Sequence, residues 1–406
     1  MLKPLEQVAA EDAAFGRTRP YWDPALTNNR RKKMQLMHAL LDLGLVRVMP
    51  LGSCKEEAGL FLVKKPGKTH SRFIVDARRA NRLFVAPPGL SMCTAETFAR
   101  LEVAAERVAA PAPSSSADAA ALGLCDVRDA FHRFRIAPEL SAYFGLGQAT
   151  AKDLHLSDRP GGELMELAWA SLPMGFSWSL FFCQRAGETA LDETLVHPLN
   201  GTLGQKVPTR LGDRSTSCQL DPGVRGVQAF YVYVDNVGLL GYGPREVSES
   251  LESVTAALAS RGLPTHEEAT HSLTAKALGV QLDLQSGRAV LTPGRLWRVR
   301  QGIRGALRHG RATGKVWEIM IGHLSYCGLL DRGSLSCLRS IYANIRKNYD
   351  VHAPLWEEAA KEVRHMTSLL PLLAGEWHRP WLADVLCTDA SETGSAQLLA
   401  NGRWKK

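Results

Sequence analysis

Two aspartates lie where buried strands are predicted to end, and carboxylates in such positions can bind metal ions. Asp126 directly follows the apolar run LGLC, and Asp235 lies at the tip of the predicted hairpin AFYVYVDNVGLLGYG. A carboxylate at the end of a buried strand is unfavourable unless it is paired or binds a cation. Two of them on adjacent strands would form a hard-oxygen site suited to Mg²⁺. Two metals about 3.5–4 Å apart would clamp the attacking and leaving oxygens of an in-line phosphoryl displacement.

Spacing alone leaves other interpretations of the two aspartates open. An aspartate after a strand is commonly a turn former or a helix cap. A metal-dependent phosphohydrolase on a different fold is another candidate, but it would need a third carboxylate or a histidine near the pair. No residue of that kind has motif-like spacing. The secondary structure around the two aspartates distinguishes these interpretations.

The surrounding sequence alternates predicted strands and helices. A helix is expected over residues 29–45, where apolar residues recur at helical spacing, and another over residues 247–262, which end at a glycine. The clearest hairpin is expected at residues 229–243, and further short strands are expected at 45–49, 59–63 and 72–75. Two polar or low-complexity segments are expected to be surface insertions: 103–121 and 196–227. After about residue 285 the pattern is helical.

A basic segment lies in that helical part. Residues 295–315 contain seven Lys and Arg and no Asp or Glu, nearly the whole excess behind the net charge of +8. At helical spacing one face would carry four arginines: Arg300, Arg304, Arg308 and Arg311. The opposite face would be apolar: Leu296, Val299, Ile303 and Leu307. Such a helix fits either a polyanion partner or an ordinary solvated surface.

Length and composition indicate a globular protein with two or three subdomains. The chain has 406 residues, 45% of them hydrophobic and 22% charged, which excludes a disordered or fibrous chain. No apolar run could cross a bilayer, and the first residues lack the pattern of a secretory signal. The eight cysteines are scattered without a CxxC pair, which disfavours a disulfide scaffold and a zinc site. We expect no membrane partner and an intracellular location, cytoplasmic or nuclear, rather than secretion.

Four segments, taken in order, resemble the successive motifs of reverse transcriptases. They are RFIVDARRANRLF, CDVRDAFHRFRI, SLPMGFSWSLFFCQ and YVYVDN, and the resemblance is to the enzymes of retroviruses and of LTR- or DIRS-type retrotransposons. It implies an α+β right-hand polymerase with fingers, a palm built on an antiparallel sheet, and a helical thumb and connection. The implied divisions are an N-terminal extension (1–28), fingers (29–122), palm (123–285), a thumb-like helical region (286–350), a connection (351–383) and a truncated ribonuclease H-like start (384–406).

The resemblance implies a catalytic centre in the palm. Asp126 and Asp235 match the residues that hold two Mg²⁺ ions, with the Val127 main-chain carbonyl as a further metal ligand, and Mn²⁺ is the expected substitute ion. His266 in GLPTHEEA falls in the segment where a proton donor to pyrophosphate is expected. An exposed loop histidine is the plainer interpretation of that residue.

Five residues are implied to contact the incoming nucleotide. Lys65 and Arg72 match the cationic pair that holds the triphosphate, which suits an ammonium point charge and a bidentate guanidinium. Phe131 matches an aromatic residue that leaves no room for a ribose 2′-hydroxyl and so favours dNTPs, although an ordinary core phenylalanine is the alternative. Asp129 matches a position near the sugar, and Met174 one beside the templating pair. Three further residues of the first motif are implied to order the fingers: Asp76, Arg78 and Asn81.

Other segments are implied to contact primer and template. The turn SLPMGFSWS contributes Pro173 and Gly175, which allow close backbone approach, and Gln184 ends the motif on the following helix. Leu278 and Gly279 match a primer-grip hairpin. The basic segment falls where a thumb would follow the duplex backbone, so its four arginines are implied to make salt-sensitive, sequence-independent contacts.

The chain departs from the family pattern at the hairpin tip. Two adjacent aspartates are usual there, whereas this sequence has Asp235 followed by Asn236. An amide oxygen can touch Mg²⁺ but brings no negative charge, so affinity for one of the two metals is expected to fall. Two hypotheses stay open. One is an RNA-directed DNA polymerase, weakened by Asn236, with dNTPs and a primed RNA or DNA template as partners. The other is a catalytically silent remnant that binds nucleic acid.

The C-terminal segment VLCTDASETGSAQLLANGRW resembles the opening hairpin of a ribonuclease H domain, with Asp389 at the first carboxylate position. Such a domain needs further carboxylates beyond the last residue of this sequence. We therefore expect no ribonuclease H activity and a chain that is a fragment of a longer polyprotein. The sequence leaves the oligomeric state open.

Overall fold

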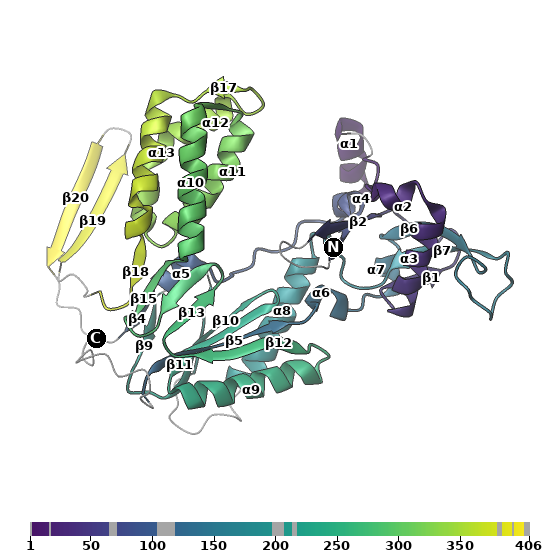
Figure 1. The fold of residues 1–406 in the computed structure, drawn as a ribbon, viewed down its shortest axis with the longest axis horizontal. Coiled ribbons are helices and arrows are strands. Elements are labelled where there is room, and N and C mark those ends of the chain that lie inside the picture. The colour runs from purple at the N-terminus through teal and green to yellow at the C-terminus, as the bar shows by residue number, and fades with distance from the viewer. Residues whose placement is uncertain are drawn as a thin grey trace.

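The computed structural model describes residues 2–15, 18–64, 71–103, 118–196, 207–212, 217–379, 384–391 and 394–401. These residues form three main bodies arranged in an open curve (Figure 1). A central sheet, with helix α9 along its outer side, occupies the base. A helical bundle stands above one end of the sheet, and an N-terminal body lies beyond the other end.

The central sheet carries both aspartates. Its strand order is β12–β5–β11–β10–β8, and every neighbouring pair is antiparallel except β10 and β8. The strands are β5 (Ala120–Val127), β8 (Thr209–Arg210), β10 (Gly226–Tyr233), β11 (Asn236–Tyr242) and β12 (Thr265–His271). The hairpin predicted at residues 229–243 is therefore confirmed as β10 and β11.

Two helices cover one face of this sheet. α8 (Ser179–Leu191) and α9 (Pro244–Ser260) pack against it through a core that includes Cys125, Phe230 and Val254. Alternate residues of β5, such as Leu122, join a different core shared with the bundle. Because side chains alternate along a strand, Asp126 continues the face of Leu122 and points away from α9.

A second, antiparallel sheet lies between the central sheet and the bundle (Figure 1). Its strands are β13 (Thr274–Ala277), β14 (Val280–Asp283), β15 (Arg288–Leu291) and β18 (Ala374–Glu376). The bundle consists of α10 (Pro293–His309), α11 (Gly314–Gly328), α12 (Arg339–Lys347) and α13 (Glu357–Leu369), with the short segments β16 (Arg311–Ala312), η3 (Arg332–Cys337), β17 (Ala353–Pro354) and η4 (Leu370–Leu372). The predicted apolar stripe of α10 is confirmed, since its members pack in the bundle core: Leu296, Val299, Ile303 and Leu307.

The prediction that four arginines share one helix face is wrong for Arg311. α10 ends at His309, and Gly310 caps it in the left-handed conformation, with φ of +66°. Arg311 lies instead in β16, which pairs with β17, and its guanidinium donates to the His352 carbonyl oxygen (3.3 Å). Glycine adopts this conformation without the steric cost of a side chain, so the helix stops there.

The N-terminal body is built on the sheet β1–β7–β6, the hairpin of β2 and β3, and helix α3. Its strands are β1 (Val46–Met49), β2 (Gly59–Lys64), β3 (Ser71–Asp76), β6 (Gly145–Thr150) and β7 (Leu164–Trp169). Its helices are α2 (Pro24–Thr27), α3 (Arg30–Asp42), α4 (Arg78–Leu83), α6 (Ala130–Arg133) and α7 (Pro138–Ser141). The helix and the three short strands predicted in this part of the chain are found as α3, β1, β2 and β3.

A buried carboxylate, paired with an exposed arginine, fixes the first motif inside this body. Asp76 is 7% exposed and accepts hydrogen bonds from Arg78 Nη2 (2.6 Å), Arg78 Nε (2.8 Å) and the Tyr21 amide (2.7 Å). Burial alone would raise the pKa of the Asp76 carboxyl, but these hydrogen bonds outweigh it and the pKa lies below its ordinary value. Asp76 therefore ties β3 to the chain ahead of α2.

The two polar segments contribute strands at their ends. β4 (Leu101–Val103) pairs in parallel with β9 (Cys218–Leu220), so the flanks of the two segments meet. β8 adds a short edge to the central sheet beside β10. Residues 104–117, 197–206 and 213–216 of these segments lie outside the described residues.

The remaining elements are α1 (Leu5–Phe15), α5 (Ala95–Ala99), η2 (Asp192–Val196) and the hairpin of β19 (Asp384–Ser391) and β20 (Gly394–Asn401). The residues that the structure describes include no helix with the length and apolar character needed to cross a bilayer.

Candidate active site

The register of the central sheet brings the predicted catalytic residues together. Asn236 of β11 is the direct partner of Asp126 of β5. The Val127 amide donates to the Asp235 carbonyl oxygen (2.8 Å), which fixes the hairpin tip against the end of β5. Directly opposite residues of antiparallel strands have Cβ atoms about 4.5–5.5 Å apart. Asp126, Asp235 and Asn236, all half-buried, therefore lie side by side at one end of the sheet.

The oxygen atoms at this end of the sheet fit a hard divalent cation. Asp126 and Asp235 provide two carboxylates, Val127 a main-chain carbonyl, and Asn236 an amide oxygen. Asn236 Nδ2 donates to Asp235 Oδ1 (3.0 Å), so this amide stands beside the carboxylate and adds no negative charge. Within the described ranges, no three His, Cys, Asp or Glu side chains gather closely enough to hold a metal. The candidate site therefore relies on two carboxylates.

Two buried cysteines beside the aspartates are held in the neutral form. Burial, with a further contribution from the charges of Glu268 and Asp126, raises the pKa of Cys125 to about 12. Burial and the charge of Asp235 likewise raise the pKa of Cys183 to about 12. A nearby carboxylate disfavours a second anion. Both side chains are therefore neutral thiols near neutral pH.

Helix α8 holds the turn that carries Asp235. The Val234 amide donates to Gln184 Oε1 (2.7 Å), and Gln184 Nε2 donates to the Val232 carbonyl oxygen (2.8 Å). Val234 has φ of +60°, a conformation that β-branched residues rarely adopt. The structure places Gln184, which the resemblance assigned to primer and template, 1% exposed and directly beneath this turn.

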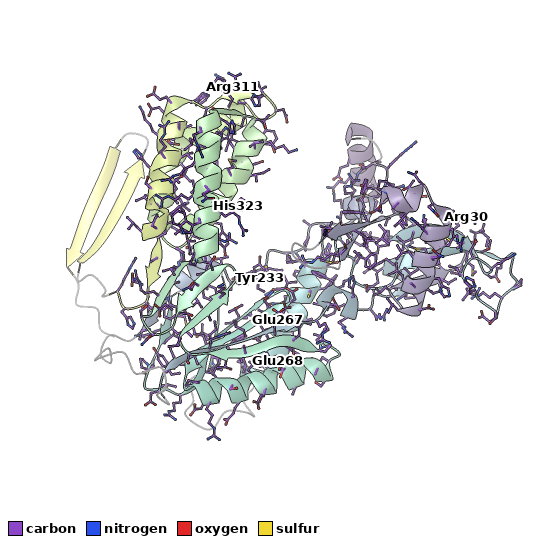
Figure 2. The ribbon with its side chains drawn as sticks, viewed as in Figure 1. Arg30, Tyr233, Glu267, Glu268, Arg311 and His323 are labelled. Atoms are coloured by element: carbon purple, nitrogen blue, oxygen red, sulfur yellow. The ribbon has the colours of Figure 1, made fainter. Side chains whose placement is uncertain are left out.

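His266 lies in strand β12 and not in a loop. It is the direct partner of Asp126 on the side opposite β11, and its Nδ1 lies 2.9 Å from the Asp126 carbonyl oxygen. Because a carbonyl oxygen only accepts, Nδ1 carries the proton in this bond. Sequence reasoning did not single out Glu267 and Glu268, which form an irregularity of β12 between His266 and Ala269 (Figure 2).

The residues predicted to contact a nucleotide come from two bodies. Phe131 lies in α6 just beyond the end of β5 and packs, half-buried, against the cores on both sides. Asp129 precedes that helix, exposed and with φ of +51°. Arg72 is exposed on β3 opposite Val63. Lys65 lies outside the described residues.

The turn SLPMGFSWS is locked to the first motif. Gly175 has φ of +127°, and a Cβ atom there would lie 2.2 Å from the Val75 carbonyl oxygen, so only glycine fits. The Val75 amide donates to the Met174 carbonyl oxygen (2.9 Å), and Asn81 Nδ2 donates to the Gly175 carbonyl oxygen (2.8 Å). Pro173 is buried and Met174 half-buried. The turn therefore makes the predicted close backbone approach to β3 of the same chain.

Leu278 and Gly279 form the two-residue turn between β13 and β14. Their φ values are +48° and +78°, and positive φ at both central residues is typical of a type I′ hairpin. The Tyr326 hydroxyl of α11 donates to the Leu278 carbonyl oxygen, and Arg295 of α10 lies 4.3 Å from the centre of the Tyr326 ring. Burial raises the pKa of Tyr326, which keeps it a phenol donor. No motif in the sequence marked Tyr326 or Arg295.

The remaining basic residues of α10 differ in exposure. Arg304 and Arg308 are exposed, whereas Arg300 is half-buried with its guanidinium 5.5 Å from the centre of the Trp297 ring. The side of the bundle nearer the N-terminal body is formed by α11, where His323 lies (Figures 1 and 2). The neighbouring Gly322 is exposed, and a Cβ atom there would have no neighbour within 4 Å. Glycine weakens a helix, and no described neighbour requires it here.

Comparison with known proteins identifies the fold. No protein-family model matches the sequence, and no curated protein matches it. The chain is similar to the foamy viral protease–reverse transcriptase dRH in complex with double-stranded DNA, with a TM-score of 0.55 and 15% identity over 95% of this chain and 55% of that chain. It is also similar to the foamy viral protease–reverse transcriptase in complex with double-stranded DNA, with a TM-score of 0.55 and 15% identity over 96% of this chain and 66% of that chain.

This likeness confirms the predicted fold class, an α+β right-hand polymerase fold with antiparallel sheets. At this level of identity the likeness concerns the fold alone. The chain spans 55% and 66% of the length of the two solved chains.

Proposed function

We propose that the chain is an RNA-directed DNA polymerase of a retroelement. The observation that carries the proposal is the pairing of Asp126 with Asn236, which sets Asp126 and Asp235 side by side at the end of a palm-type sheet. The four ordered motifs and the reverse-transcriptase fold support the same function. The reaction is the attack of a primer 3′-hydroxyl on the α-phosphate of a dNTP, with release of pyrophosphate.

The reaction centre consists of groups on neighbouring strands. Asp126, Asp235 and the Val127 carbonyl would hold two Mg²⁺ ions, which when bound stabilise the charge on the attacking and leaving oxygens. The backbone of Asp126 is fixed on both sides, by Asn236 and by His266. Groups that are already in place need little reorganisation during the reaction. The imidazole of His266 is the candidate proton donor to pyrophosphate.

Nucleotide selection would use side chains around this centre. Arg72 of the fingers, together with Lys65, would hold the triphosphate through charge-assisted hydrogen bonds. Phe131 would lie against the sugar and exclude a 2′-hydroxyl. Asp129 and Met174 would border the same site.

The thumb and the palm would hold the primer–template. The Leu278–Gly279 turn, supported by Tyr326, would contact the primer. Arg304 and Arg308 would neutralise backbone phosphates, so binding would weaken as salt rises. The exposed Gly322 of α11 would let a nucleic-acid backbone come close to the helix.

The C-terminal hairpin supports a retroelement origin. β19 and β20 pair in register, with Asp389 opposite Ala396. A two-stranded antiparallel start with an aspartate on its first strand is the arrangement expected for a ribonuclease H-like segment.

A second candidate function is nucleic-acid binding without catalysis. The observation that favours it is Asn236, which stands directly opposite Asp126 and replaces a carboxylate by a neutral amide. With one charge fewer, one of the two metals would be held more weakly.

Primer extension on an RNA template tests both functions. Wild type and Asn236→Asp are compared with dNTPs or rNTPs, in Mg²⁺ and in Mn²⁺. We expect wild type to extend with dNTPs and Asn236→Asp to extend faster in Mg²⁺, by on the order of tenfold for a change at a metal ligand. If wild type binds primer–template but only Asn236→Asp extends it, the silent binding protein is the correct function. If neither variant extends, the polymerase proposal is wrong.

A further inference from the structure

A buried carboxylate lies under the hairpin that carries Asp235. Glu188 of α8 is 3% exposed. A carboxylate removed from water needs partners for its charge. Glu188 Oε2 accepts from Arg185 Nη1 (2.8 Å) and lies 3.8 Å from Arg210 Nη1, while Oε1 accepts from Gln184 Nε2 (3.0 Å). No motif in the sequence marks Glu188.

Glu188 sets the orientation of the Gln184 amide. A carboxylate accepts and does not donate, so it fixes the Gln184 nitrogen on its own side. One hydrogen of that nitrogen is given to Glu188, and the other is given to the Val232 carbonyl oxygen (2.8 Å). The Gln184 oxygen must then face the other way, where it accepts from the Val234 amide (2.7 Å). The side chain of Gln184 thus connects Glu188 to both sides of the turn.

The turn needs this support because its backbone is strained. Val234 adopts φ of +60°, where a β-branched side chain crowds the backbone. The hydrogen bond that the Val234 amide donates to Gln184 stabilises that conformation. It thereby stabilises the position of Asp235, the next residue. Gly187 allows the approach of the helix, since a Cβ atom there would lie 2.8 Å from Val232 Cγ1.

The outer end of this connection comes from the polar segment between α8 and β10. Arg210 belongs to β8, which is paired in parallel with β10 through Phe230. Its Nη1 also donates to Asp192 Oδ2 (2.8 Å), so the guanidinium spans the two acids on the α8 side. The segment therefore reaches the palm through a strand and through a charged side chain.

We propose that Arg210 and Glu188 are positioning residues that fix the Asp235 turn through Gln184. The inserted segment around β8 is then a support of the reaction centre, and loosening it changes how the hairpin holds a metal. The effect on the reaction rests on the proposed polymerase function. The effect on the turn does not, because it can be measured without catalysis.

Hydrogen exchange in the full chain tests the effect on the turn. Exchange of the amides in residues 230–238 is followed by mass spectrometry in wild type, Glu188→Gln, Arg210→Met and Arg210→Lys. We expect exchange at the turn to accelerate by about tenfold or more in Glu188→Gln, the loss of a buried charge-assisted hydrogen bond. Arg210→Met should show a smaller increase, and Arg210→Lys, which keeps the charge, should restore part of it.

The control is Arg245→Met, which removes an exposed arginine paired with Glu249 (2.8 Å) on α9. It should leave the exchange of the turn unchanged. Primer extension then measures the Mg²⁺ concentration for half-maximal rate, which should rise severalfold in Arg210→Met with an unchanged primer–template Kd. Loss of a purely structural residue would raise the primer–template Kd together with this Mg²⁺ concentration.

The outcomes separate the two proposals. If wild type does not extend primers but Arg210→Met still loosens the turn, the polymerase function fails and the positioning role stands. If Arg210→Met folds and its turn exchanges as in Arg245→Met, the positioning role is wrong. Arg210 is partly exposed, with 40% of its side chain accessible, so this variant keeps the test valid even where Glu188→Gln does not fold.

Discussion

Two hairpin turns of the palm region both contain residues with positive φ, but different contacts stabilise them. Each is a two-residue turn, and each has positive φ: +60° at Val234 in the first, and +48° and +78° at Leu278 and Gly279 in the second. The first turn uses no glycine and is held from inside the palm by Gln184. The second uses a glycine and is held by the thumb, through the Tyr326 hydroxyl.

Under the proposed function, this difference implies separate roles for the two turns. The turn with Asp235 is fixed to α8 and to β5, elements of the palm that share one core. The turn with Leu278 is fixed to α11, so it would follow any movement of the thumb. A reaction centre benefits from rigid placement of its charges, whereas a contact to a duplex benefits from moving with the helices that hold that duplex.

The largest expected effect separates chemistry from binding. Asp235→Asn should lower the single-turnover rate of primer extension by at least about 10³-fold, because it removes a charge placed at the reacting atoms. Leu278→Ala, at the tip of the other turn, should lower that rate only a few-fold at saturating primer–template. Rapid-quench measurements on both variants check this. Equal losses would show that the two turns do not differ in role.

A smaller effect concerns the backbone of the two turns. Gly279→Ala should lower the free energy of unfolding by about 1–2 kcal/mol, because the Cβ atom of alanine disfavours the left-handed backbone conformation of this residue. Val234→Gly should change stability by less than about 1 kcal/mol, since relief of strain is offset by the flexibility of glycine. Urea denaturation measures both. Gly302→Ala, at an open helical position, is the control and should stabilise by about 0.5–1 kcal/mol.

The smallest expected effect concerns the hydroxyl that holds the second turn. Tyr326→Phe removes one hydrogen bond to the Leu278 carbonyl, a loss of about 1 kcal/mol. It should raise the primer–template Kd roughly fivefold and leave the extension rate at saturation unchanged. Fluorescence anisotropy at two salt concentrations gives the Kd. A fall in the extension rate with unchanged Kd would contradict the assignment of this turn to binding.

Part of this arrangement could be predicted from the sequence. Apolar runs that end at Asp126 and Asp235 placed both carboxylates at strand ends, because a buried strand leaves a local apolar pattern. The end of α10 could also be predicted, because glycine, here Gly310, commonly terminates a helix. The spacing of the arginines nevertheless suggested a longer helix. These features are local, and local patterns specify them.

The supports of the site could not be predicted in the same way. Gln184 lies about 50 positions before the hairpin whose amide it binds, and Tyr326 is 48 positions from the Leu278 carbonyl. Such bonds depend on how helices pack on sheets, and no periodicity records that. β8 and β9 are short strands within a polar segment, too short to show alternation. The sequence around His266 resembles a loop because the irregularity after this residue breaks the alternation of β12.

The proposed polymerase function depends most directly on Asp126, whose carboxylate would act at the reacting atoms. Primer extension and primer–template Kd are measured together for Asp126→Asn and for Asp158→Asn, an exposed aspartate outside the four motifs. We predict that Asp126→Asn loses extension by at least about 10³-fold while its Kd stays that of wild type, and that Asp158→Asn keeps both. Extension by Asp126→Asn at the rate of Asp158→Asn would contradict it.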